Sequence, residues 1–158
     1  EKGSKFYFSI MTVFENAEVA AISVGFGRKE ARERAAAALN VMGIGQRADQ
    51  SAGALPYGHE RRAEIARALA MAPKFLLLDE PAAGLNEDES DELLAILTPL
   101  PQNMNLGMLI VEHDMRLVMD ICDRVCAISF GKFLACDTPE SIQKNSLVQE
   151  AYLGEKED

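Results

Sequence analysis

Residues 75–86 read Phe75-Leu76-Leu77-Leu78-Asp79-Glu80-Pro81-Ala82-Ala83-Gly84-Leu85-Asn86. Consecutive apolar residues followed by turn-forming residues predict a strand that is buried on both faces, the kind found in parallel sheets. Asp79 and Glu80 then stand at the carboxyl end of that strand, where α/β sheets bind their ligands. This stretch therefore predicts both the fold class and the place of a site.

Helices and strands alternate on both sides of this stretch from Leu55 onward. The predicted strands are 75–78, 108–111, 125–130 and 132–136, and the predicted helices are 61–70, 87–97 and 115–122. Strands separated by helices favour parallel crossover connections, so we expect an α/β fold with a mainly parallel sheet flanked by helices. Gly131 predicts a hairpin turn between the last two strands.

Three segments differ in their patterns. Residues 1–53 are predicted to be a helical subdomain, with one helix capped by Thr12 and another over 28–42. Residues 54–138 are predicted to form the α/β core, and residues 139–158 a helical tail.

The composition is that of a globular protein, with 158 residues, 48% hydrophobic residues and a net charge of −9. The acidic excess disfavours nonspecific nucleic-acid binding, so no nucleic-acid partner is expected. Basic residues at 28–34 and at Arg61, Arg62 and Arg67 alternate with Glu and Ala, and we expect them on solvated helix faces. No window is long and apolar enough for a membrane span.

The three cysteines, Cys122, Cys126 and Cys136, are odd in number and do not form a C-x-x-C pair. We expect free buried thiols in a reducing compartment and predict no metal site among them.

Phosphoryl transfer needs a carboxylate to hold Mg²⁺ at the phosphates and a second polar group to orient the attacking water. Asp79 suits the first role and Glu80 the second. Taken alone, however, the pair is better explained as solvated acids that end a hydrophobic strand.

Two further elements strengthen the hydrolase interpretation. A glycine turn at Tyr57-Gly58 precedes a helix, whose N-terminal N–H groups suit a phosphate. His113 follows the strand at 108–111 and can donate a hydrogen bond to a γ-phosphate. Each element alone has a structural explanation, but their order along the chain favours a nucleotide site.

Together these segments resemble the ATP-binding subunits of ABC transporters. Residues 55–59 correspond to the signature segment of that family, 75–81 to its Walker B strand, and 82–86 to its D-loop. The resemblance implies a partial P-loop NTPase fold with ATP and Mg²⁺ as cofactors, with Glu80 and His113 catalytic and Asp79 holding Mg²⁺ through water. It also implies nucleotide-binding roles for Leu55, Pro56, Tyr57, Gly58, His59 and Asn86.

Within the family, the chain is most similar to importers of branched-chain amino acids. The resemblance rests on the Tyr-Gly signature, the Arg-Arg stretch after it, the Asn-ended D-loop and the terminal residues 150–154. Lipopolysaccharide-export ATPases share the Arg-Arg stretch and the Tyr-Leu-Gly ending, and they remain the close alternative. ATPases of DNA repair also share the signature, but they carry coiled-coil heptads, which are not found in this sequence.

The sequence departs from the family pattern at several positions. Pro56 replaces the usual signature serine, and it has neither a hydroxyl nor an N–H to offer a phosphate. His59 replaces a glutamine and Asn86 the D-loop aspartate. At Pro56 and His59 the side chains therefore differ from those that the family pattern places at the nucleotide.

The phosphate-binding loop G-x-x-x-x-G-K-[ST] does not occur in these residues. The resemblance begins near Met11, so we expect the Walker A loop, the Q-loop and the adenine-stacking aromatic to lie upstream. Without that loop the isolated chain should bind ATP weakly or not at all. Micromolar binding in a calorimetric titration with Mg²⁺ would contradict this expectation.

The resemblance further implies a second ATPase subunit and ABC transmembrane subunits as partners, at the inner face of the plasma membrane. A non-catalytic module that keeps only docking and dimerisation surfaces is the alternative. An unpaired apolar edge beside the strand at 75–78 or the strand at 108–111 should also recruit another chain.

Overall fold

The computed structural model describes residues 9–153, in two units that meet in sequence between Val111 and Glu112. The predicted helical subdomain and tail extend to residues 1–8 and 154–158, which lie outside the described residues. Within the described part of the chain, no helix combines the length and apolar character that crossing a membrane needs.

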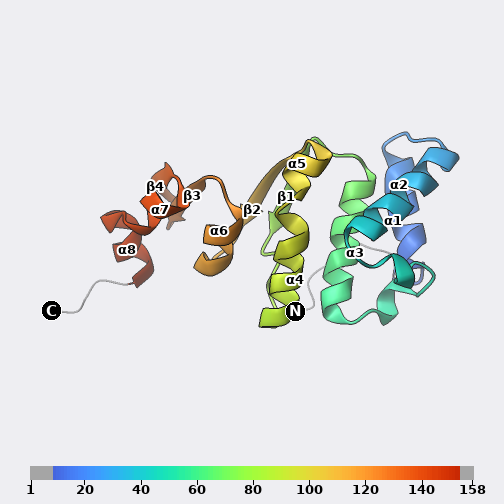
Figure 1. The fold of residues 1–158 in the computed structure, drawn as a ribbon, viewed down its shortest axis with the longest axis horizontal. Helices are drawn as coiled ribbons and strands as arrows, with labels where there is room; N and C mark the ends of the chain where they lie inside the picture. The colour runs from blue at the N-terminus through green and yellow to red at the C-terminus, as the bar shows by residue number, and fades with distance from the viewer. Residues whose placement is uncertain (1–8, 154–158) are drawn as a thin grey trace. The chain divides into compact units, whose positions relative to one another are not determined.

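The first unit begins with helices that pack on one another. α1 (Val13–Ser23), α2 (Arg28–Val41) and α3 (Tyr57–Ala70) lie side by side, with the short 3₁₀ turns η1 (Gly45–Arg47) and η2 (Ala52–Ala54) between α2 and α3 (Figure 1). Small buried side chains make close packing possible; they include Ala17, Ala20, Ala21, Ala31, Ala35 and Ala66.

α1 starts where the sequence predicts. The Thr12 hydroxyl accepts a hydrogen bond from the backbone N–H of Glu15 at 3.1 Å, and the Glu15 carboxylate accepts one from the backbone N–H of Thr12 at 2.8 Å. This reciprocal capping box satisfies two N–H groups at the helix start. The hydrogen bonds lower the pKa of the Glu15 carboxyl.

The rest of the first unit holds the predicted parallel strand pair. β1 (Phe75–Asp79) pairs in parallel with β2 (Gly107–Val111), and α4 (Glu87–Leu97) and α5 (Leu100–Met104) form the crossover between them. Leu76 and Leu78 are buried, whereas Phe75 and Leu77 are exposed. The predicted strand is confirmed, but this exposure shows that it is not buried on both faces.

The second unit is a hairpin with three helices. It comprises α6 (Met115–Ile121), β3 (Val125–Ser129), β4 (Lys132–Asp137), α7 (Pro139–Gln143) and α8 (Ser146–Leu153). Its core is formed by Ala127, Ile142 and Val148. The predicted hairpin at Gly131 is confirmed, with positive φ at both turn residues, 45° at Phe130 and 73° at Gly131. A turn of this type matches the twist of the two strands.

Only part of the predicted sheet is parallel in the structure. The described residues form one parallel pair, β1–β2, and one antiparallel pair, β3–β4, as separate two-stranded sheets. β3 pairs with its sequence neighbour because a two-residue turn closes a hairpin at much lower entropic cost than a crossover. The mixed α/β character agrees with the prediction.

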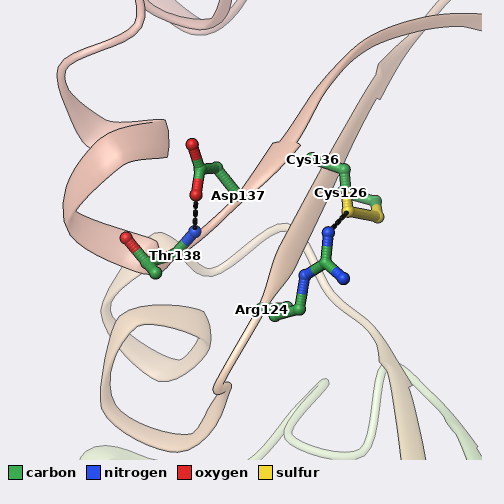
Figure 2. The surroundings of a disulfide bond; sticks show 5 residues. All are labelled: Arg124, Cys126, Cys136, Asp137 and Thr138. Atoms are coloured by element: carbon green, nitrogen blue, oxygen red, sulfur yellow. Dashed lines mark hydrogen bonds between the residues drawn. A yellow bond between two sulfur atoms is a disulfide. The ribbon is translucent and has the colours of Figure 1, made fainter.

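The prediction of free thiols is wrong for two of the three cysteines. Cys126 and Cys136 face each other across the hairpin, with Cα atoms 4.1 Å apart, and they form a disulfide (Figure 2). The Arg124 guanidinium lies 3.7 Å from the Cys136 sulfur. Cys122 is a free thiol, as predicted, and burial together with the negative charge of Asp123 raises its pKa.

Candidate functional site

Asp79 and Glu80 stand at the carboxyl end of β1, as predicted. Asp79 is in register with Val111 of β2, and the backbone N–H of Glu80 donates to the Val111 carbonyl at 2.8 Å. Both acids are exposed. Asp79 also lines a cavity of about 370 Å³ between β1 and α3, together with Arg61 and Glu64. The two carboxylates are thus accessible at the end of the parallel pair.

Glu80 has an unusual backbone conformation. Its φ is 43°, in the left-handed region that non-glycine residues seldom adopt. Its carbonyl accepts hydrogen bonds from the Arg61 guanidinium at 3.2 Å and from the backbone N–H of Ala83 at 3.1 Å. Such conformations persist where surrounding contacts hold them, and they concentrate at functional sites.

The signature segment, residues 55–59, forms the start of α3. Leu55 is buried, and Pro56 is the N-cap residue without a side-chain cap. Tyr57, Gly58 and His59 occupy the first turn, where backbone N–H groups have no partner within the helix. Those N–H groups and the positive end of the helix dipole suit an anion.

The structure brings the signature segment against the D-loop, residues 82–86. The Tyr57 hydroxyl donates to the carbonyl of Ala83 at 3.0 Å. Gly84 has a φ of 78°, and a Cβ there would lie 3.0 Å from the Tyr57 ring. A tyrosine at the start of α3 therefore contacts the loop that follows Glu80 through both its ring and its hydroxyl.

A second contact joins the signature segment to the first turn of α4. A Cβ at Gly58 would lie 2.7 Å from a carboxylate oxygen of Glu89, so a larger residue there would require that carboxylate to shift. Glu89 belongs to the capping box of α4, in which the Asn86 side chain accepts from the Glu89 N–H at 2.9 Å. Asn86, the predicted D-loop contact, thus serves as the N-cap of α4.

His59 is partly buried and lies near both basic and acidic side chains. Burial lowers the pKa of His59, and the positive charges of Arg47 and Arg62 lower it further, against the opposite effect of Glu92 and Glu89. A neutral imidazole at the helix start can accept or donate a hydrogen bond without adding charge.

His113 lies in the second unit, directly before α6. Its side chain is largely exposed, and its backbone N–H donates to the Glu112 carboxylate at 3.2 Å. Asp114 caps α6 by accepting from the N–H groups of Arg116 and Leu117. The predicted catalytic role of His113 stays a prediction.

Arg61 belongs to the site, although the sequence placed it on a solvated face. It contacts the Glu80 carbonyl and pairs with Glu64 at 3.1 Å, and its side chain is only 25% exposed. Arg62 pairs with Glu92 and is similarly protected. The prediction of a solvated face is therefore wrong for these two residues. The available signal was spacing, because Arg61 is four residues after Tyr57 and shares its helix face.

The donors present fit Mg²⁺ held together with a nucleotide. Asp79 offers one exposed carboxylate and Glu80 a second. Within residues 9–153, no group of three or more metal-ligating side chains occurs. Mg²⁺ in phosphoryl-transfer sites is held by one or two carboxylates with phosphate oxygens and water, rather than by an all-protein cage.

Two family models match parts of this chain. The family described as ABC transporter matches residues 3–83, and the family described as branched-chain amino acid ATP-binding cassette transporter matches residues 134–158.

Two similar curated proteins are ATP-binding proteins of transport or export systems. The chain is 48% identical over 127 residues to the high-affinity branched-chain amino acid transport ATP-binding protein BraF of Pseudomonas aeruginosa, covering 80% of this chain and 50% of that protein. It is 39% identical over 150 residues to the lipopolysaccharide export system ATP-binding protein LptB of Haemophilus influenzae, covering 94% and 62%. The chain thus spans about half the length of the BraF relative.

A solved structure gives the same result for the fold. CbiO1 from Clostridium perfringens, part of the ABC transporter complex cbiONQ, superposes with a TM-score of 0.80 and 28% identity, over 94% of this chain and 59% of that one. Because the family pattern covers residues 3–83 and the solved structure shares the fold, the chain belongs to the ABC transporter family.

Proposed function

We propose that this chain supplies the signature segment, the Walker B carboxylates and the D-loop of an ATP-binding subunit that drives uptake of branched-chain amino acids. The observation that carries the proposal is the cluster at the start of α3. There Tyr57 contacts the loop after Glu80, Arg61 contacts the Glu80 carbonyl, and Gly58 packs on the cap of α4. This cluster joins a phosphate-binding helix start to two carboxylates.

Each side chain has a role under this proposal. Glu80 orients the attacking water, and Asp79 holds Mg²⁺ through water. The first-turn N–H groups of α3 offer hydrogen bonds to the phosphates of a nucleotide bound by a partner. Mg²⁺ supplies neutralisation of the phosphate charge when bound. His113 is assigned to the γ-phosphate as a hydrogen-bond donor.

The proposed partners follow from the same assignment. The N–H groups at the start of α3 would contact a nucleotide whose phosphates a second ATPase subunit holds. Transmembrane subunits at the inner face of the plasma membrane would couple hydrolysis to transport. The substrate assignment is supported by the match of residues 134–158 and by the name of the BraF relative.

Uptake of radiolabelled leucine in cells that lack the gene encoding this chain tests the proposal. We expect uptake to fall at least tenfold and to return when the gene is supplied. Unchanged leucine uptake would contradict it. The relation to LptB makes lipopolysaccharide export the second candidate. That candidate predicts normal leucine uptake with lipopolysaccharide retained in the inner membrane.

A non-catalytic role is the remaining alternative. In that case the gene product would restore uptake even when Glu80 is replaced by Gln, because hydrolysis by this chain would not be needed. The comparison of wild-type and Glu80→Gln complementation therefore separates an enzyme component from a docking module.

A further inference from the structure

The contact between Tyr57 and the D-loop stands out, because Tyr57 is 51% exposed and yet makes two specific contacts. Its hydroxyl donates to the Ala83 carbonyl at 3.0 Å, and its ring leaves no room for a Cβ at Gly84. An exposed tyrosine whose role was confined to packing would not need both contacts. Its hydroxyl is directed to the backbone of this chain.

Tyr57 acts together with Arg61 on the same loop. The two residues share a face of α3 because they are four positions apart. Tyr57 binds the carbonyl of Ala83, and Arg61 binds the carbonyl of Glu80 at 3.2 Å. The same two loop residues are joined by the hydrogen bond from the Ala83 N–H to the Glu80 carbonyl, at 3.1 Å. The start of α3 therefore holds both ends of the turn that begins at Glu80.

The conformation of this turn makes such support necessary. Glu80 has a φ of 43° and Gly84 a φ of 78°, both in the left-handed region. A left-handed conformation is unfavourable for a non-glycine residue and persists only when its surroundings fix it. Contacts from α3 supply part of that restraint at the residue assigned to catalysis.

We propose that Tyr57 is a positioning residue whose hydroxyl aligns the Glu80 turn and the D-loop with the signature segment. This inference rests on the proposed function and goes beyond it. The hydroxyl acts on the chain's own backbone and not on the nucleotide. A phosphate bound at the start of α3 then changes the position of Glu80. Any shift of Tyr57 moves the Ala83 carbonyl that is bound to it, and Ala83 is hydrogen-bonded to Glu80.

Steady-state ATPase kinetics of the complete subunit, with the Tyr57→Phe variant, test this role. We expect kcat to fall about fivefold, the factor corresponding to the net worth of one hydrogen bond. The KM for ATP should stay within about twofold, because the nucleotide loses no contact. A raised KM with unchanged kcat would instead show a direct nucleotide contact and overturn the proposal, as would no change in either constant.

Thr98→Val provides a matched control. Thr98 also donates its hydroxyl to a backbone carbonyl, that of Leu94 at 2.8 Å, but at the far end of α4. We expect its kcat to match that of the wild type. An equal loss in both variants would show a general effect of deleting a hydroxyl and would contradict the positioning role.

Hydrogen exchange on the 158-residue chain tests the positioning role of Tyr57 separately from the proposed ATPase function. In Tyr57→Phe the Ala83 and Leu85 amides should exchange several-fold faster, while the amides of α1 keep their rates. Unchanged exchange at the loop would overturn the Tyr57 proposal even if the complete subunit is active. A complete wild-type subunit without ATPase activity would overturn the proposed function, whatever the exchange result.

Discussion

Asn86 stands where the family pattern has an aspartate, and its side chain caps the N-terminus of α4. Its side chain accepts from the Glu89 N–H at 2.9 Å, and the Glu89 carboxylate accepts from the Asn86 N–H at 3.1 Å. Three acids in the first turn of α4 complement the helix dipole as well. The N-terminus of α4 is therefore fixed next to the signature segment.

Replacing Asn86 by Ala should destabilise the chain by about 1 kcal/mol, because the N-cap hydrogen bond is lost. Asn86→Asp keeps an oxygen acceptor and should unfold at nearly the wild-type denaturant concentration. Urea unfolding followed by circular dichroism measures both. Equal stability of the Ala and Asp variants would show that the cap contributes little.

His59 makes the stability of the chain depend on pH. Its pKa is lowered in the folded state, so the folded chain binds fewer protons than the unfolded chain below about pH 6.5. The stabilising contribution is fully present above that pH and is lost as the pH falls through the lowered pKa. His59→Gln should therefore flatten the fall in unfolding free energy between about pH 7 and pH 5. A wild-type pH profile in this variant would contradict the assignment.

The site residues differ in how far the sequence reveals them. Asp79 and Glu80 were identified because an apolar strand that ends in acids is a strong local pattern. Arg61 was assigned to a solvated face, because a partner 19 positions away leaves no trace in local charge alternation. The sequence does show that Arg61 is four residues after Tyr57 and shares its helix face, but it does not show which loop that face contacts.

Among the elements, the β3–β4 hairpin has a predictable turn and a strand register that the sequence does not show. The turn at Gly131 was predicted, and counting outward from it pairs Ile128 with Phe133. A regular ladder would then place Cys126 opposite Ala135. A register shift between Ala127 and Ile128 brings Cys136 opposite Cys126 instead. Bulges of this kind depend on packing against neighbouring elements, so the disulfide could not be derived from cysteine spacing.

The disulfide should stabilise the second unit under oxidising conditions. It closes a loop with a sequence separation of 10 residues, for which loop-closure entropy gives roughly 2–3 kcal/mol. A thermal melt with and without dithiothreitol should show a lower Tm after reduction. The Cys136→Ala variant should be insensitive to the reductant, and Cys122→Ala should respond as the wild type does. An unchanged Tm on reduction would show that the hairpin is held by its other contacts.

The helices were predicted well for a physical reason. α1 and α4 both begin at capping boxes, which are short-range patterns in the sequence. α5 was missed because it has five residues and begins between two prolines, where the sequence resembles a loop.

At the scale of the whole molecule, the exposed face of the β1–β2 pair is the most unusual surface. Phe75, Leu77, Leu109 and Val111 are 75%, 71%, 58% and 56% exposed, and Leu77 is in register with Leu109. Parallel strands normally have both faces covered. An apolar face of this kind promotes association.

We expect the 158-residue chain to self-associate through this face. The double variant Leu77→Ser/Leu109→Ser should sediment as a monomer at concentrations where the wild type forms larger species. Leu147→Ser is the control, since Leu147 is similarly exposed, at 55%, on α8. A wild-type chain that is monomeric at all concentrations would contradict the expectation.

Single-turnover ATP hydrolysis by the complete subunit, which carries these residues and a Walker A loop, tests the role of Glu80 when the wild type is compared with Glu80→Gln. We expect hydrolysis in the variant to be slower by at least about a hundredfold, because the group that orients the attacking water is lost, while MgATP affinity stays within about twofold. Hydrolysis at the wild-type rate would contradict it, because the carboxylate at the end of β1 would then have no part in the chemistry.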